Sequence, residues 1–279
     1  GVGQIRARGQ ARQGGDIRAS DILHHNGRWY LSLTVAVAVP ERARQADCAM
    51  AYDWGVETFL SGVTHADETI QINNPRWWQQ EKDQTIRLQQ AVSSKPNRRS
   101  NRRKKAVRRL AAARAKVARK RLNWAHQQTA ALASRYALVA TEELTLKNMT
   151  HSAAGTVEKP GKQVAQKAGL NREILDTAPG LFTSLFRYKV LETGGEWVDA
   201  PTRKLKPSQR CPRCWHVAKK QLSQRMHCCE QCGHQENRDT ASARVVLRWA
   251  LESISGQELA ETGIHPPRET PSFATHRVE

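Results

Sequence analysis

Two Cys-x-x-Cys pairs are the feature that most constrains how this chain can fold. Cys211 and Cys214 form the first pair, Cys229 and Cys232 form the second, and 14 residues separate them. Two such pairs allow four thiolates to converge in the tetrahedral geometry of structural zinc. Redox-active Cys-x-x-Cys motifs instead occur singly, at the start of a helix. The spacing therefore predicts a zinc ribbon over residues 206–236, with zinc in a structural role.

The residues around these pairs refine the expected ligand set. Cys228 adjoins Cys229, but pairing it with Cys232 would leave three residues between the ligands, so we do not expect it to bind zinc. Gly233 is expected to provide the turn that directs backbone amides toward sulfur. Cys48 is expected to be a buried residue of a strand. The histidines nearest the pairs are expected only as outer contacts: His216, His227 and His234.

The composition points to a polyanionic partner. The 279 residues include 45 Lys and Arg against 26 Asp and Glu, a formal net charge of +19. This excess is typical of nucleic-acid-binding proteins, although a ribosomal-type or merely basic surface protein would share it. No stretch is apolar enough to span a membrane, and residues 1–13 lack the apolar core of a secretion signal. We therefore expect an intracellular protein with no membrane partner.

The positive charge is concentrated in one helical segment. Residues 81–136 have helical periodicity, interrupted near Pro96, and 14 basic residues but no acidic ones lie between Lys95 and Arg121. So many like charges favour a phosphate-binding surface over a merely solvated helix face. The predicted buried stripe is Val107, Ala111, Ala118, Leu122, Ala125, Thr129, Leu132 and Tyr136. The predicted nucleic-acid-binding residues are Arg98, Arg99, Arg102, Arg103, Lys104, Lys105, Arg108, Arg109, Arg114, Lys116, Arg119, Lys120 and Arg121.

The remaining elements alternate between sheet and helix. A hairpin around Asn26 and Gly27 is expected within residues 16–39, its second strand having one buried face. After a linker at 40–47, the expected elements are strands at 48–54, 58–64 and 68–72 forming an antiparallel meander, a strand at 137–141, a flexible loop at 150–169, a helix at 181–193, a strand at 196–200 and a helix at 239–253. With the long helical segment after the third strand of the meander, this order predicts an α/β, RNase H-like mixed sheet with helices on both faces.

Three carboxylates fall where such a fold would bring them together. Asp53 ends the first strand of the meander, Glu142 follows the strand at 137–141, and Asp239 begins the last helix. Hydrolysis of a phosphodiester with two Mg²⁺ ions needs carboxylates converging from several elements. Each acid also has an ordinary explanation: a turn residue before Gly55, a surface residue beside Glu143, or a helix N-cap. Together they predict a catalytic Mg²⁺ site.

Four motifs resemble the TnpB (OrfB) family of transposon-encoded RNA-guided nucleases, relatives of the type V CRISPR effectors. They are Tyr52-Asp53-Trp54-Gly55-Val56, similar to the first RuvC motif Asp-x-Gly; Thr141-Glu142-Glu143-Leu144-Thr145-Leu146-Lys147-Asn148-Met149, similar to the second motif Glu-Asp-Leu-Asn-x-Lys-Asn-Met; Ser208–Cys214 with Cys229–Gly233, similar to the zinc ribbon; and Asn237-Arg238-Asp239, similar to the Asn/Asp-Arg-Asp that carries the third acid. The second motif selects Glu142 over Glu143. Similarity extends over about residues 1–254.

The resemblance implies a RuvC domain that cuts DNA with Mg²⁺ at a site chosen by a guide RNA. Guide RNA and target DNA are then the expected partners, in the cytoplasm of a prokaryotic cell near the nucleoid. The implied domains are a partial wedge-like β segment at 1–40, a nuclease core at 47–205 containing the basic helical region 81–136, the ribbon at 206–236, the last RuvC helix at 237–254 and a disordered tail at 255–279. Two alternatives stay open, a catalytically silent nucleic-acid binder (a domesticated repressor or a fragment) and a strand-transfer transposase.

The chain also departs from the family pattern. Most of the family's N-terminal recognition half is missing, and Gly1 stands where an initiator Met would, so we expect an incomplete N-terminus. Trp54 is bulkier than the usual middle residue of the first motif. Ala241-Ser242-Ala243 replaces the Asn-Ala-Ala that often follows the third acid. We expect neither departure to touch a metal ligand.

Overall fold

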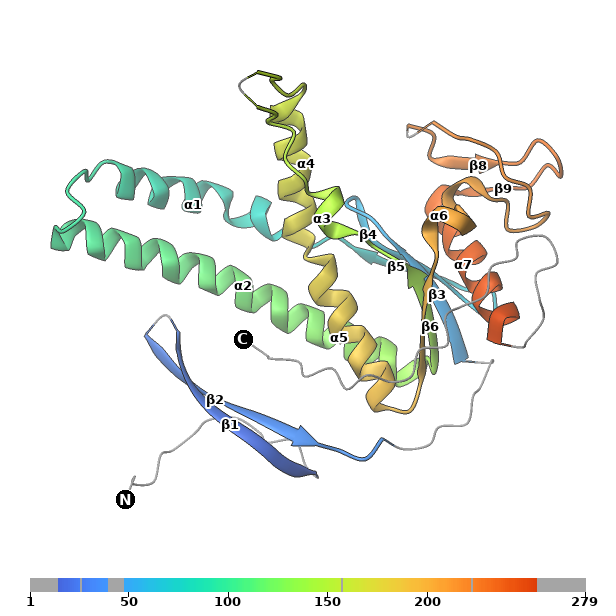
Figure 1. Cartoon of the computed structure of the whole chain (residues 1–279), viewed down its shortest axis with the longest axis horizontal. Coiled ribbons are helices and arrows are strands. Elements are labelled where there is room, and N and C mark those ends of the chain that lie inside the picture. The colour runs from blue at the N-terminus through green and yellow to red at the C-terminus, as the bar shows by residue number, and fades with distance from the viewer. Residues whose placement is uncertain (1–14, 26, 40–47, 157, 222, 255–279) are drawn as a thin grey trace.

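The computed structural model describes residues 15–25, 27–39, 48–156, 158–221 and 223–254, and its centre is a five-stranded sheet (Figure 1). Its strands lie in the order β5-β4-β3-β6-β7. The strands are β3 (Ala49–Trp54), β4 (Thr58–Thr64), β5 (Thr69–Asn73), β6 (Leu138–Glu142) and β7 (Glu196–Ala200). The linker predicted at 40–47 and the tail predicted at 255–279 lie outside the described residues.

The sheet is mixed, as the order of elements predicts. β3, β4 and β5 form the predicted antiparallel meander, while β6 pairs with β3, and β7 with β6, in parallel. Each parallel connection passes through helices, because parallel strands cannot be joined by a tight turn. This is the RNase H-like arrangement, and the predicted fold class is confirmed.

Helices cover both faces of the sheet. α7 (Arg238–Ile254) packs on one face, and α2 (Asn101–Arg135) and α5 (Pro179–Glu192) pack on the other. Side chains alternate along a strand, so Ala49 and Ala51 of β3 join the α7 side, whereas Met50 and Tyr52 join the α2 and α5 side. The same alternation along β3 and β6 assigns Asp53 and Glu142 to the α7 side.

α1 (Trp77–Ser93) and α2 form a long helical hairpin that extends beyond the sheet (Figure 1). Ser100 caps α2, its side chain accepting the backbone N–H of Arg103 at 3.2 Å. The predicted buried stripe is correct for Ala125, Thr129 and Leu132 but wrong farther toward the N-terminus, where the Val107 side chain is 45% exposed. The stripe fails there because the first half of α2 lies beyond the sheet.

β1 (Asp16–His25) and β2 (Arg28–Ala36) form the predicted antiparallel hairpin. The expectation that β2 buries one face is wrong, since Leu31 is 53% and Leu33 is 39% exposed. Alternating apolar residues predict a face that prefers burial. They do not supply the partner, and within the described part of the chain no other element packs closely on this hairpin.

Three further elements differ from the expectations. The loop predicted at 150–169 is shorter, because α4 (Val164–Thr177) begins inside it. A short helix, α3 (Leu146–Met149), precedes the loop. Cys48 lies just before β3 and is half-buried rather than a buried strand residue. The ribbon region holds α6 (Thr202–Leu205), η2 (Pro207–Gln209), β8 (Met226–Cys228) and β9 (Gln235–Asn237). None of the helices that the structure describes is long and apolar enough to cross a membrane.

Candidate functional site

Asp53 and Glu142 stand at the ends of two neighbouring parallel strands. The register pairs Tyr52 of β3 with Thr141 of β6, so the next residue on each strand is one of the two acids. The Thr141 hydroxyl donates to the backbone oxygen of Tyr52 at 3.2 Å and ties the strand ends together. Glu143 has the opposite orientation and is exposed. The geometry is therefore consistent with the choice of Glu142 over Glu143.

Asp239 enters from the first turn of α7, the helix that covers the side of the sheet on which both other acids lie. The cap of this helix is Asn237, whose side-chain oxygen accepts the backbone N–H of Asp239 at 3.0 Å and of Thr240 at 3.4 Å. The capping role that could have explained Asp239 thus belongs to Asn237. We call Asp53, Glu142 and Asp239 the acidic triad.

The members of the acidic triad affect one another's ionisation. Burial raises the pKa of Asp53 well above its usual range, and the charges of Glu142 and Asp239 raise it further. Burial also raises the pKa of Glu142. Arg238 opposes both shifts through its positive charge. Half-buried carboxylates that repel one another form an environment that a hard divalent cation would stabilise.

The carboxylates are not gathered around a single point. Among the described residues, the cysteine cluster is the one group whose ligand atoms converge as they would around one ion. Carboxylate oxygens are the ligands that Mg²⁺ prefers, so the donor chemistry of the triad fits this ion.

Two residues that were not predicted from the sequence, Ser242 and Arg238, also belong to this site. Ser242 donates from its hydroxyl to Glu142 Oε1 at 2.9 Å, so the expectation that residues 241–243 touch no ligand is wrong. Arg238 donates to the backbone oxygens of Gln221 at 3.1 Å and Gln224 at 3.4 Å, which holds its charge near the triad. The spacing could have indicated Ser242, because residues three apart share one side of a helix and Asp239 is three residues earlier.

The four predicted zinc ligands come together. Their sulfur atoms all lie within 4.8 Å of one another, with 3.6 Å between Cys211 and Cys232 and 3.5 Å between Cys214 and Cys229. Tetrahedral zinc with Zn–S bonds of about 2.3 Å would hold sulfur atoms about 3.8 Å apart, so the cluster fits this metal. Cys228 is exposed on β8 and stays outside the group.

The two halves of the cluster have the same backbone geometry. Gly233 has φ +69° and donates its N–H to the Cys229 oxygen at 2.9 Å, which provides the expected turn. Trp215 has φ +67° and donates in the same way to Cys211 at 3.0 Å. Positive φ is unfavourable for a bulky side chain. Trp215 is nevertheless buried, with the guanidinium of Arg248 over its ring at 4.4 Å.

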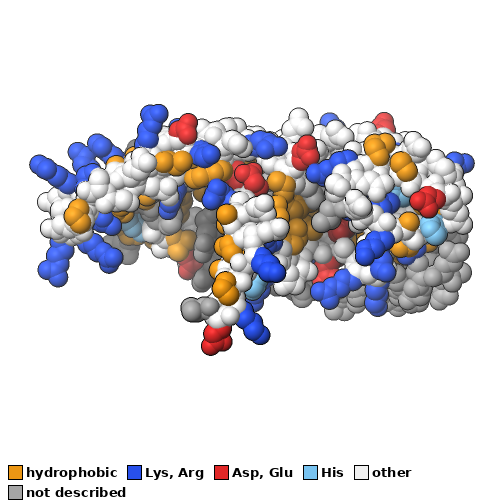
Figure 2. Space-filling model, turned by 90° about the horizontal axis from the view of Figure 1, so that it is seen from above, with side chains coloured by type: hydrophobic (Ala, Val, Ile, Leu, Met, Phe, Trp, Pro, Cys, Tyr) orange, Lys and Arg blue, Asp and Glu red, His pale blue; other side chains and the backbone are white. Residues whose placement is uncertain are grey.

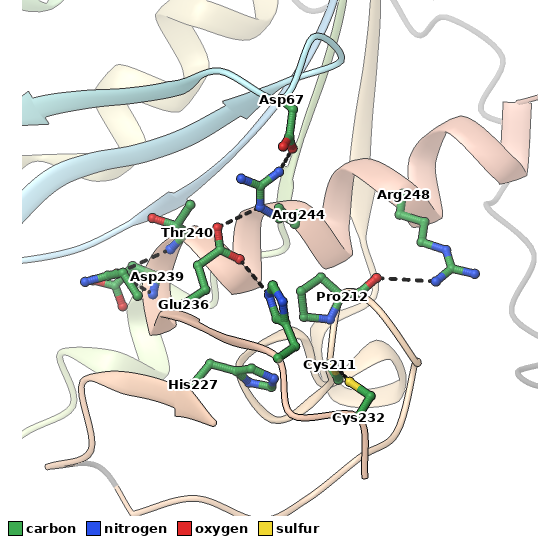
Figure 3. A network of polar contacts seen from close by, with 12 residues as sticks. Asp67, Cys211, Pro212, His227, Cys232, Glu236, Asp239, Thr240, Arg244 and Arg248 are labelled. Atoms are coloured by element: carbon green, nitrogen blue, oxygen red, sulfur yellow. Dashed lines mark hydrogen bonds and ion pairs between the residues drawn. The ribbon is translucent and has the colours of Figure 1, made fainter. Parts of the chain in front are cut away.

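A polar network joins the ribbon to α7 (Figure 3). His234 contacts Glu236 at 3.3 Å, and Glu236 accepts from Arg244 Nε of α7 at 2.7 Å. Arg244 also pairs with Asp67, in the turn between β4 and β5. The His234 side chain contacts Glu236, while its backbone oxygen accepts the N–H of Cys229 at 2.9 Å. The network and the anchoring of Arg238 connect the ribbon to the helix that carries Asp239.

The basic residues of the helical hairpin are mostly exposed. Figure 2 shows Lys and Arg side chains projecting from the end of the molecule where α1 and α2 are joined. Three of the thirteen predicted nucleic-acid-binding residues contact the protein itself. Arg103 donates to the Val92 oxygen at 2.9 Å, Lys120 pairs with Glu81 at 3.0 Å, and Arg121 is engaged with α4. The other ten side chains remain exposed to solvent.

Comparisons with known proteins agree with this geometry. The profile of the OrfB family of IS605-type elements, described as "Probable transposase", matches residues 32–153, and the profile "Cas12f1-like, TNB domain" matches residues 180–246. Over 276 residues the chain is 30% identical to "Putative RNA-guided DNA endonuclease InsQ" of Escherichia coli (strain K12). The chain belongs to the TnpB (OrfB) family. This confirms the resemblance of the four motifs.

Other relatives of this TnpB-family chain are more distant. It is 28% identical over 245 residues to "Putative RNA-guided DNA endonuclease" of Streptomyces pristinaespiralis. Cryo-EM structures of a CRISPR-Cas12f ternary complex and of a Cas12f1-sgRNA-target DNA complex share its fold, with TM-scores of 0.50 and 0.55 at 17% and 15% identity, each covering 78% of this chain and 42% of the other. The chain spans 66% and 54% of the length of its two curated relatives.

Proposed function

We propose that this chain is the nuclease part of an RNA-guided, Mg²⁺-dependent DNA endonuclease associated with a transposable element. The observation that carries the proposal is the acidic triad: three half-buried carboxylates from β3, β6 and α7 on the side of the sheet that α7 covers, where burial and then the charges of Glu142 and Asp239 raise the pKa of Asp53. Three acids half-buried on one side of the sheet need compensation, because desolvation of unneutralised charge is unfavourable. A cation-binding role accounts for their placement.

Each member of the triad would act as an oxygen ligand. When bound, Mg²⁺ supplies Lewis acidity and lowers the pKa of water, which is what phosphodiester hydrolysis needs. Asp53 and Glu142 would hold their positions because the β3–β6 register fixes their backbones. Asp239 would hold its position because Asn237 caps the first turn of α7. In this proposal residues 47–205 and 237–254 form the nuclease core, residues 206–236 its zinc ribbon, and the hairpin within 1–40 a wedge-like segment.

The helical hairpin would bind the phosphate backbone of the guide RNA and target DNA. Ten exposed cations lie along α2 and the turn before it, and such a concentration of positive charge favours binding to a polyanion. Both curated relatives carry names that describe RNA-guided DNA endonucleases, which supports guide RNA and DNA as partners. A protein of this kind would act in the cytoplasm, on DNA of the nucleoid.

One experiment tests the catalytic assignment. The chain is expressed with RNA from its own locus, the co-purified RNA is sequenced, and a plasmid carrying the matching target is incubated with the complex and Mg²⁺. Asp53→Ala, Glu142→Ala and Asp239→Ala are each expected to abolish cutting while RNA binding is unchanged. Glu143→Ala is the matched control, since it removes the adjacent exposed carboxylate.

The other outcomes of this experiment identify the competing functions. Cutting that survives in Asp53→Ala would overturn the site. Wild-type chain that binds RNA and DNA but never cuts would be a catalytically silent binder. Joined DNA products in place of simple breaks would indicate a strand-transfer transposase, the function suggested by the description of the OrfB profile.

A further inference from the structure

Ser242 is a polar residue in the apolar face of α7. Its side chain has no exposed surface, and Ala241, Ala243 and Val245 around it are also buried. A buried hydroxyl without a hydrogen-bond partner costs about 1–3 kcal/mol, so its partner matters. That partner is Glu142 Oε1, to which the hydroxyl donates at 2.9 Å. The hydroxyl of Ser242 is therefore directed at a member of the acidic triad.

The position of Ser242 on α7 links two members of the triad. It follows Asp239 by three residues, so one turn of the helix carries both the third acid and the donor that contacts the second. Thr202 of α6 lies nearby, but its hydroxyl donates to the backbone oxygen of Glu143 at 3.3 Å. Ser242 therefore connects the carboxylate of Glu142 on β6 to α7.

The hydrogen bond restricts the rotation of the Glu142 carboxylate, because Ser242 holds its Oε1 atom. Outer hydrogen bonds of this kind orient metal-binding carboxylates in proteins.

Packing alone does not call for a hydroxyl at this position. Ser242 stands where the family pattern has the first alanine of Asn-Ala-Ala, and both of its immediate neighbours on the helix are alanines. An alanine would fill nearly the same volume. The polar atom is accounted for by its contact with Glu142.

We propose that Ser242 is a positioning residue that orients the carboxylate of Glu142 for binding a divalent cation, an inference that rests on the proposed function. Removing the hydroxyl would leave the fold intact and weaken the cation site. The effect of Ser242 on cation affinity would depend on Glu142. It would disappear when Glu142 can no longer bind the ion.

The test uses Mn²⁺ as a spectroscopic probe for Mg²⁺ on the zinc-loaded chain without nucleic acid. Binding is measured by electron paramagnetic resonance of free Mn²⁺. We expect Ser242→Ala to weaken binding about tenfold and Ser242→Thr, which keeps the hydroxyl, to weaken it less than about threefold. Thr177→Val is the matched control, because it removes a buried hydroxyl that bonds only within α4, to the Ile174 oxygen.

A double-mutant cycle separates positioning from packing. In a Glu142→Gln background, adding Ser242→Ala is expected to cause no further loss of Mn²⁺ affinity. Unchanged affinity in Ser242→Ala, or an equal additional loss in the Glu142→Gln background, would overturn the proposal. Should Ser242→Ala fail to fold, Ser242→Cys supplies the same comparison with a weaker donor. If Asp53→Ala binds Mn²⁺ as tightly as the wild-type chain does, the proposed function itself fails. This outcome is distinguishable from a failure of the Ser242 proposal, which concerns only the Ser242 variants.

Discussion

Arg121 of α2 donates from its guanidinium to Asp176 of α4 at 2.5 Å. The other carboxylate oxygen of Asp176 accepts the backbone N–H of Trp78, in the first turn of α1, at 2.7 Å. One buried carboxylate therefore ties three helices together where the helical hairpin meets the rest of the molecule. Arg121 belongs to the predicted nucleic-acid-binding set, but only 22% of its side chain is exposed and its charge is already paired.

Replacing Asp176 with Ala should destabilise the protein strongly. The change leaves Arg121 partly buried without its counter-ion and the N–H of Trp78 without an acceptor, and breaking such a pair costs about 3–5 kcal/mol. Glu81→Ala, which breaks the more exposed pair with Lys120, should cost less than about 1 kcal/mol. Urea unfolding measures the loss of unfolding free energy in both variants. Equal costs for the two variants would contradict the structural role of Asp176.

Lys116 and Lys120 offer a direct test of the phosphate-binding surface. They lie four residues apart on the same side of α2, but only Lys120 is paired, with Glu81 at 3.0 Å. Lys116→Ala should reduce the slope of log K against log salt concentration by about 0.7–0.9 for RNA or DNA binding, the effect of one lost phosphate contact. Lys120→Ala should change it less. The slope is measured by fluorescence anisotropy at several salt concentrations. An unchanged slope in both variants would show that the phosphate contacts lie outside this part of α2.

The stability of the metal-free protein should depend on Asp53 and on pH. Because the folded-state pKa of Asp53 is raised above its ordinary value of 3.8, the stability linked to its protonation is full below that pH. It is lost as the pH rises through the folded-state pKa. Asp53→Asn cannot ionise, so its unfolding free energy without divalent ions should exceed that of the wild type by an amount that grows with pH.

Mg²⁺ provides the control for this prediction. Mg²⁺ should stabilise the wild type but not Asp53→Asn. The difference in unfolding free energy between the two proteins should therefore shrink or reverse when Mg²⁺ is added. Thermal unfolding at several pH values, with and without Mg²⁺, measures the effect. A wild type that is more stable than Asp53→Asn in metal-free buffer at neutral pH would show that Asp53 is compensated by other groups.

Zinc removal should disturb the acidic triad as well as the ribbon. The backbone N–H of Arg238 donates to the Arg225 oxygen at 2.8 Å, so the start of α7 depends on the folded ribbon. Cys211→Ser should lose the zinc, make residues 206–236 sensitive to protease and lower Mn²⁺ affinity. Cys228→Ser should keep zinc and affinity, because Cys228 lies outside the cluster. Elemental analysis, limited proteolysis and Mn²⁺ titration report the three effects, and zinc loss in Cys228→Ser would revise the ligand set.

Local sequence signals predicted most of the elements near the acidic triad. The apolar residues before Asp53 belong to the strand predicted at 48–54, and β3 is that strand. The doubled Cys-x-x-Cys spacing predicts a cluster whose geometry depends mainly on two short turns. These features succeed because neighbouring residues determine them. Periodicity also predicted a buried stripe along α2 and a buried face of β2. The stripe is wrong in the first half of α2 and the buried face of β2 is wrong, because burial also requires a partner.

The sequence by itself determined the kind of sheet, the four sulfur ligands and the identity of the three candidate acids. The tertiary structure decided which residues meet those acids and which cations are paired within the protein. Ser242 reaches Glu142 across 100 positions of the chain, and Arg121 reaches Asp176 across 55. Contacts of this range depend on how α7 lies on the sheet and how α4 crosses the helical hairpin. The packing of whole elements sets those positions, and no local pattern contains that information.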